Sequence, residues 1–235
     1  MRNLIALELK RNRLRSYHIA VLICGVTMLG FQYLIAAIPY MNPTGRDAEL
    51  FSQYPFLMGI TYLVCMAIFA ILSAVMASRF VVEEYSGKRA ILLFSYPISR
   101  EKVLCAKLVL VFLYTSGAML LCGAVIQAVF FLTESLFPLC CDQLTVEVIL
   151  QSLGFLRCCS VLAGLLGVVS LWFGFRKKSV SVTIVASVIL TALVCQVIAA
   201  TLAFLPMMGA VLGVTGILAA LAIENLLRQV NNMEV

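Results

Sequence analysis

An uncharged run of 45 residues, positions 179–223, restricts this chain to a few kinds of fold. As one α-helix the run would be about 67 Å long, which is about twice the ~30 Å hydrocarbon core of a bilayer. Pro206 lies where a break is needed, because a proline disrupts the helical turn that precedes it. The run therefore predicts two membrane spans, 180–205 and 207–223, of which the second is short and could include a re-entrant piece.

Four further apolar runs are long enough to cross a membrane, since a transmembrane helix needs about 20 apolar residues. They cover residues 17–38, 56–78, 104–132 and 150–175. Hydrophobic residues fill 63% of the 235 positions and charged residues 12%, whereas soluble domains have about 45–50% and about 25%. The sequence predicts an all-α integral membrane protein, one domain over 1–235 with six transmembrane helices, which leaves no room for a soluble catalytic domain.

Basic residues gather in alternate connections between these spans. Fifteen of the 17 lysines and arginines lie in residues 2–15, 79–107, 176–178 and the tail after 223. The other loops carry only Arg46, with Arg157 near the outer end of the fourth span. The positive-inside rule then places both termini in the cytoplasm of a multi-pass plasma-membrane protein. The net charge of +6 serves this topology, so nucleic acid is not an expected partner.

Residues 2–15 combine apolar side chains with a basic cluster. This composition predicts an amphipathic N-terminal helix that lies on the cytoplasmic leaflet near anionic headgroups. A plain cluster of topogenic charges is the alternative. A cleaved signal peptide fits less well, because the apolar run that follows has about 22 residues and a signal core has 7–15.

The sequence contains no catalytic or metal-binding constellation. His18 is the one histidine of the chain, so motifs that need two are excluded, and its place at the membrane boundary favours an interfacial role. No GxxxxGK[ST] loop is present, and no carboxylate pair lies in an apolar run, where intramembrane proton relays have theirs. The chain is therefore expected not to be an enzyme.

The nine cysteines fall into two groups. Cys24, Cys65, Cys105, Cys122 and Cys195 are single residues in apolar segments, where cysteine acts as a small hydrophobe. The adjacent pairs Cys140–Cys141 and Cys158–Cys159 lie near the predicted outer face. They either form a disulfide in an oxidising exterior or remain free thiols in a reducing one.

Four polar side chains lie deepest in the predicted spans. They could line a substrate path, or they could simply bond a neighbouring helix, which is the commoner use: Gln127, Gln196, Thr191 and Thr201. Two pairs of small residues have the four-residue spacing that lets membrane helices approach closely, namely Ala163 with Gly167 and Gly209 with Gly213.

Residues 79–107 form the largest charged island between two spans. The second span is expected to continue as a helix to Tyr85 and to end at Gly87, which tolerates a left-handed cap. A short amphipathic helix over 88–94 follows. Pro97 disfavours helix at the residue before it, and Ser99 is a good N-cap for the helix that feeds the third span. An ordinary cytoplasmic loop with topogenic charges is the alternative.

Two stretches resemble the permeases of type-2 ABC exporters. Residues 83–100, EEYSGKRAILLFSYPISR, are similar to the acidic pair, glycine, apolar run and Pro-[Ile/Val]-Ser-Arg that follow the second span in that family. Residues 7–16, LELKRNRLRS, look like its amphipathic connecting helix. The motifs cover the first half of the chain, and the second half agrees in topology. The family often has an extracellular re-entrant element after the fifth span, which only residues 205–213 could supply here.

The resemblance implies the transmembrane half of a pump. Two permease subunits, identical or paralogous, would stand on two ABC-type ATPase subunits that bind ATP and Mg²⁺, while this chain binds no cofactor itself. The short helix over 88–94 would dock in a groove of the ATPase. The residues expected to couple the two are Glu83, Glu84, Tyr85, Gly87, Lys88, Arg89, Ile91, Leu92, Leu93 and Phe94.

The function that the resemblance implies is export of a hydrophobic or amphipathic substrate by an ATP-driven ABC transporter. Small permeases of this size resemble those that move antimicrobial peptides, lantibiotics or drugs out of the cell, often for resistance. A hypothesis from another class is a non-transporting membrane subunit, an assembly or sensor partner that docks a cytosolic protein through residues 79–107.

Overall fold

The structure, a computed structural model, describes residues 14–41, 51, 53–85, 100–136, 145–200 and 205–231, and these are almost wholly helical. Six of the helices are long and apolar enough to cross a membrane, which confirms the all-helical, six-span prediction. The elements in chain order are α2 (Arg15–Met41), α4 (Tyr54–Ala77), the π-helix η1 (Ser78–Val82), α5 (Glu83–Tyr85), α7 (Arg100–Leu136), α8 (Val146–Lys177), α9 (Val180–Ala199) and α10 (Leu205–Asn231).

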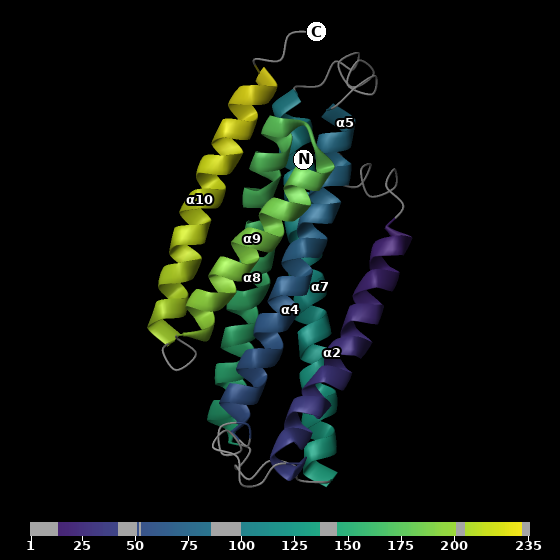
Figure 1. Cartoon of the computed structure of the whole chain (residues 1–235), viewed down its shortest axis with the longest axis vertical. Coiled ribbons are helices and arrows are strands. Elements are labelled where there is room, and N and C mark those ends of the chain that lie inside the picture. The colour runs from purple at the N-terminus through teal and green to yellow at the C-terminus, as the bar shows by residue number, and fades with distance from the viewer. Residues whose placement is uncertain are drawn as a thin grey trace.

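The helices form one elongated bundle in which α2 and α10 lie at opposite edges (Figure 1). In the most apolar stretch of α8, 72% of the residues are buried, against 22% in α2, α9 and α10. In α4 the share is 56%. The second and fourth spans therefore make the centre of the bundle, and the first, fifth and sixth present most of their apolar surface outward.

Glycines on α8 let its neighbours approach closely. A Cβ added at Gly167 would lie 2.5 Å from the Ser73 Cβ of α4, and one at Gly174 would lie 2.7 Å from the Thr183 Cβ of α9. Small residues at such contacts allow van der Waals packing where no hydrophobic driving force between helices exists. The Ala163–Gly167 pair is thus part of an internal contact. A Cβ added at Gly209 or at Gly213 would meet no atom of the described residues within 4 Å, so neither glycine makes a close helix contact there.

A tight turn joins α8 to α9. The Lys178 N–H donates to the Phe175 carbonyl (3.2 Å) and the Ser179 N–H to the Gly174 carbonyl (3.1 Å), with Lys178 in the left-handed region at φ 50°. These are the two bonds of a Schellman motif, which caps the last carbonyls of a helix. The basic triplet 176–178 therefore occupies the last turn and cap of α8, and the fifth span starts at once.

All six long helices differ in their bounds from the predicted spans, and the largest differences are in α7, α9 and α10. Helix α7 runs to Leu136, beyond 132, and α9 ends at Ala199, before 205. Pro206 lies in the first turn of α10, where its missing N–H has no helical partner to lose. Helix α10 continues to Asn231, and the exposed Arg228–Glu224 ion pair (2.6 Å) spans one turn of its polar end. The last span is thus a full helix of 23 apolar-rich residues, Met208–Val230.

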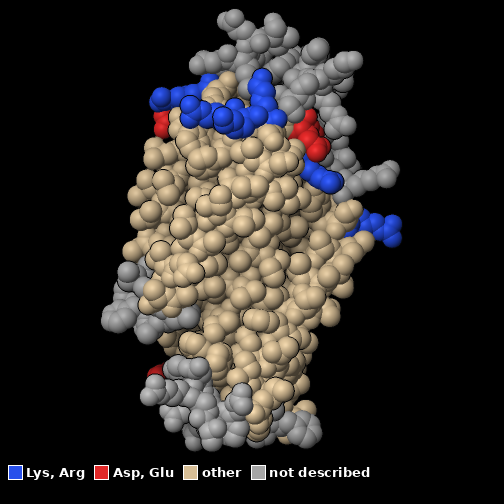
Figure 2. All heavy atoms as spheres, viewed as in Figure 1, with Lys and Arg blue, Asp and Glu red and all other residues tan. Residues whose placement is uncertain are grey.

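Lysines and arginines gather at one end of the bundle, where α2 begins and where η1 and α8 end (Figure 2). We call this the basic end. The opposite end, where α4 begins and α7 ends, is called the far end. That the basic end faces the cytoplasm remains a prediction from charge placement.

We predict that Gly167→Leu destabilises the bundle, because the new side chain must displace Ser73 from the α4–α8 contact. Overpacking of this kind costs about 1–3 kcal/mol. The measurement is the temperature at which half of the detergent-purified protein loses its monodisperse elution peak. Gly154→Leu is the matched control, since a Cβ at Gly154 meets nothing within 4 Å. Equal midpoints for the two variants would contradict the packing argument.

Candidate functional site

The second and third spans meet at the basic end in a polar joint. Helix α4 does not stop at the predicted membrane boundary but passes through the π-helix η1 into α5. In η1 the Glu83 N–H donates to the Ser78 carbonyl, five residues back, so the helix is locally wider than an α-helix. Such π-turns are rare and are frequent at functional sites. The expectation that the second span continues as a helix to Tyr85 is met.

Lys107 on α7 holds this widened turn. Its Nζ donates to the Phe80 carbonyl at 2.9 Å and forms an ion pair with Glu84 Oε2. The Lys107 side chain is only 1% exposed and that of Glu84 is 15% exposed. A buried ammonium is tolerated when it is both paired and hydrogen-bonded. We call Phe80, Glu84 and Lys107 the inner joint.

Apolar side chains seal the inner joint on the membrane side. Val81, Leu104 and Leu171 are buried in one cluster that also takes in residues of α10. The Tyr17 ring of α2 packs edge-on against Phe80, with ring centroids 5.8 Å apart. All six long helices contribute side chains to this cluster, α9 through the partly buried Val180. The joint therefore lies in a low-dielectric setting, in which its charge-assisted bonds are strong.

Two of the ten predicted coupling residues have described side chains. Glu83 is exposed at the basic end, whereas Glu84 points to Lys107. Tyr85 is the last residue of α5, and its side chain lies outside the described part. The remaining seven also lie outside the described residues: Gly87, Lys88, Arg89, Ile91, Leu92, Leu93 and Phe94. The predicted short helix over 88–94 is thus untested, as is the N-cap role of Ser99 before α7.

Of the four polar residues considered for a substrate path, the three described ones differ in burial. Gln127 is buried on α7, and Thr191 is buried on α9. Gln196, on α9, is exposed on the outside of the bundle, and Thr201 lies outside the described residues. The Thr191 hydroxyl has no hydrogen-bond partner in the part of the chain that the structure describes. Each of these residues remains a separate candidate for a substrate path.

Gln127 belongs to a polar cluster that the sequence reading recognised only in part. Tyr62 of α4 donates its hydroxyl proton to Gln127 Oε1 at 3.2 Å, while Gln127 Nε2 has no partner among the described residues. Gln32 of α2 is 1% exposed, and neither its Nε2 nor its Oε1 has a partner there. Contacts of Tyr33 with Phe130 and Thr133 bring this part of α2 to the same depth as Gln127. We call the bonded pair Tyr62 and Gln127, together with Gln32 at a similar depth on α2, the amide cluster.

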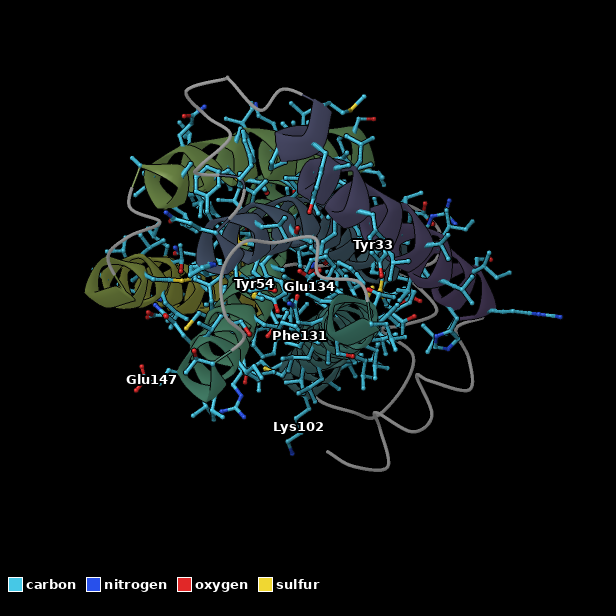
Figure 3. The ribbon with its side chains drawn as sticks, turned by 90° about the horizontal axis from the view of Figure 1, so that it is seen from below. Tyr33, Tyr54, Lys102, Phe131, Glu134 and Glu147 are labelled. Atoms are coloured by element: carbon cyan, nitrogen blue, oxygen red, sulfur yellow. The ribbon has the colours of Figure 1, made fainter. Side chains whose placement is uncertain are left out.

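A second group of polar side chains lies between the helices at the far end. Tyr54 of α4 donates to Glu134 Oε1 at 2.9 Å, and Tyr33 of α2 is bonded to Thr133 at 2.5 Å. Seen along the bundle, Tyr33, Tyr54 and Glu134 lie among the helices, whereas Glu147 points outward (Figure 3). Glu134 is 3% exposed, although it lies beyond residue 132, where the predicted third span ends. The Tyr54 bond explains why the helix accommodates this carboxylate.

The two adjacent cysteines of α8 form no disulfide in the described part of the chain. Cys158 and Cys159 are free thiols, and Cys159 is buried in the main core. Cys140 and Cys141 lie outside the described residues. Of the two alternatives for these pairs, the free thiols are what the structure contains at 158 and 159. His18, expected at the membrane boundary, is exposed there and bonds Tyr114 through Nδ1 at 2.9 Å.

Lys107, Gln32 and Tyr62 were not singled out from the sequence. A signal existed for the first two, because each is a polar residue inside or beside an apolar run, where such residues are expensive and often functional. The residues that bond or surround Lys107 and Gln32 could not be identified from the sequence in this way. Tyr62 looks like any aromatic residue of a span until Gln127 is placed beside it.

We predict that Lys107→Met lowers the thermal midpoint strongly, because Glu84 and the Phe80 carbonyl lose this donor in a buried setting. Breaking a buried pair from one side costs on the order of 3 kcal/mol. The double variant Lys107→Met with Glu84→Gln is expected to regain part of the loss, since no charge is left behind. Measured midpoints that fall equally for single and double variants would rule out the ion pair as the cause.

Comparison with known proteins gives a family. Residues 4–194 match the family described as ABC-2 family transporter protein. The chain is 32% identical over 193 residues to an uncharacterized protein of Bacillus subtilis (strain 168), YcbO, and the match covers 82% of each chain. No solved structure matches it. The family match takes in the inner joint, the amide cluster and the first four spans, as the resemblance in residues 7–16 and 83–100 implied. The chain therefore belongs to the ABC-2 transporter family, as a transmembrane subunit of an ABC transporter.

Proposed function

We propose that this chain is the permease subunit of an ATP-driven exporter, working with a separate ABC-type ATPase that binds ATP and Mg²⁺. The observation that carries the proposal is the inner joint. It ties the helix that enters residues 86–99 to the helix that leaves them, through Glu84 and Lys107. A partner that pushes on residues 86–99 would therefore move α4 and α7 together.

The position of the inner joint suits the transmission of force. Glu84 lies in the last turn before residue 86, and Lys107 lies two turns after α7 begins at Arg100. Helix α4 is central in the bundle and contacts α8 and α9 along its length. A shift of the joint would thus reach the core directly, because packed helices move as rigid elements and not by continuous deformation.

We further propose a transporter of two permease subunits in the plasma membrane, with both termini of each in the cytoplasm. The basic end would face the ATPase. The outward apolar faces of α2, α9 and α10 support contacts with lipid and with a second permease, identical or paralogous. The substrate would be hydrophobic or amphipathic, such as a peptide, lantibiotic or drug, since the spans offer mainly amides and hydroxyls. The two described ion pairs, Glu84–Lys107 and Glu224–Arg228, both lie toward the basic end.

We predict that Glu83→Lys weakens ATPase docking without unfolding the permease. Glu83 is exposed beside the joint, so a reversed charge changes the surface offered to the partner and not the core. The measurement is the amount of ATPase that co-purifies with the tagged permease from its native host, with ATP hydrolysis per complex. A loss of tenfold or more is expected.

Glu147→Lys is the control for this experiment, because Glu147 is equally exposed but lies at the far end of the bundle. It should retain the ATPase. If both variants retain it, the basic end is not the docking face. If an ATPase docks but no compound among peptides, lantibiotics and drugs accelerates ATP hydrolysis or is exported, the non-transporting subunit becomes the better explanation.

We predict that Gln32→Met stabilises the protein and lowers export. The Gln32 amide is buried with no partner among the described residues, and unsatisfied polar groups within a membrane cost several kcal/mol. Methionine has a similar shape and needs no hydrogen bond, so the thermal midpoint should rise. Export of the substrate identified by co-purification should fall several-fold if the amide cluster binds it.

Met28→Leu is the control for this variant, since Met28 lies one turn away on the same buried face of α2. It should leave both readouts near the wild-type values. A Gln32→Met protein that is more stable and exports normally would remove the amide cluster from the substrate path.

A further inference from the structure

A groove runs between α2 and α7 on the outside of the bundle, starting near the basic end. Its volume is about 660 Å³, and its lining is apolar except at one end. The floor and walls include Val21, Leu22 and Gly25 of α2 and Leu113, Gly117 and Leu121 of α7. Leu22 and Leu121 are well exposed, so the groove opens toward the surface that faces the hydrocarbon. An apolar groove in that position fills with hydrocarbon and not with water.

The hollow lies beside Gly117 of α7, where a side chain is missing. A Cβ added at Gly117 would meet no atom of the described residues within 4 Å. At Gly25 the two helices are close, because a Cβ added there would lie 3.0 Å from Cys122 Sγ. Above and below the hollow they touch, through His18 with Tyr114 and through Tyr33 with Phe130.

The groove has the length of one leaflet. Its lining runs from His18 to Leu29 on α2 and from Leu113 to Ile126 on α7. At 1.5 Å per residue these stretches measure about 16 Å and about 20 Å. Half of a ~30 Å hydrocarbon core is about 15 Å. A helix of a second copy would cross both leaflets, whereas an acyl chain occupies one.

Polar and basic groups stand at the headgroup end. His18 Nδ1 is bonded to the Tyr114 hydroxyl at 2.9 Å. When that hydroxyl donates, the neutral ring carries its proton on Nε2, which has no partner among the described residues and can donate outward. Arg15 lies three residues before His18, hence on the same helix face, and is exposed. Both side chains lie where α2 begins, at the end of this helix that is nearer the basic end.

We propose that this groove is a binding site for one anionic phospholipid. One acyl chain fills the hollow over Gly25 and Gly117, and the phosphate is held by Arg15 and His18 Nε2. The bound lipid would complete the packing between α2 and α7 and so brace the first span against the third. The inference does not depend on whether the chain exports anything.

The test uses the full-length permease, delipidated in detergent and studied by native mass spectrometry. The probes are phosphatidylglycerol and phosphatidylcholine with identical acyl chains. One phosphatidylglycerol per chain is expected to survive activation that strips the others, with at least tenfold preference over phosphatidylcholine. Gly117→Leu places a side chain in the hollow, with a Cβ that meets no described atom within 4 Å, and should abolish this retained lipid, whereas Gly154→Leu should keep it.

A second variant tests the contacts to the lipid headgroup separately from the contacts to the acyl chain, and it leaves the hollow unchanged. Arg15→Gln with His18→Gln should lose the preference for phosphatidylglycerol while still binding either lipid weakly. Glycerol 3-phosphate alone should not compete, because it has no chain to bury. Retention that is unchanged in Gly117→Leu, or equal for the two lipids in wild type, would mean annular lipid only and overturn the proposal. So would a dimer of the wild type that Gly117→Leu converts to monomer, since a second copy would then be the occupant.

Discussion

A lysine ammonium group buried beside the membrane core is tolerated only if the protein supplies an opposite charge and hydrogen-bond acceptors. Lys107 meets this condition through the Glu84 carboxylate and the Phe80 carbonyl. Both partners belong to the end of the second span. The need to satisfy one cation therefore fixes where α5 lies against α7, and with it the two points between which residues 86–99 must run.

The π-helix follows from the same constraint. A regular α-helix uses each carbonyl for an N–H four residues later, whereas the turn in η1 shifts a bond to the fifth residue and loosens the ladder. A loosened carbonyl at Phe80 can then accept Lys107. The π-turn and the Lys107 bond therefore meet at the same residue, directly before the segment at which docking is proposed.

Apolar length and charge placement were enough to predict six helices and their order, because crossing a bilayer imposes both. They were not enough to predict the residues at which α7 and α9 end. A polar residue ends a membrane helix only when no other residue bonds it. Glu134 stays inside α7 because Tyr54 bonds it. Lys107 stays inside the joint because Glu84 lies in reach, and the sequence separates these two residues by more than twenty positions. Gln32 was visible as a lone amide in an apolar run, but its burial depends on the neighbours of α2.

Two glycines also show that the sequence alone does not give the packing of the helices. Gly167 and Gly117 both lie in apolar helices. Ala163 lies four residues before Gly167 and no small residue has this spacing from Gly117, but Gly209 and Gly213 share the spacing without a close contact among the described residues. In the bundle Gly167 removes a side chain so that α4 and α8 can touch, and Gly117 removes one where nothing replaces it. In water an empty apolar groove would favour closure of the two helices. In a bilayer the hydrocarbon itself is available to fill it, so lipid becomes part of the packing, and the first span can be held in place without a protein neighbour on that side.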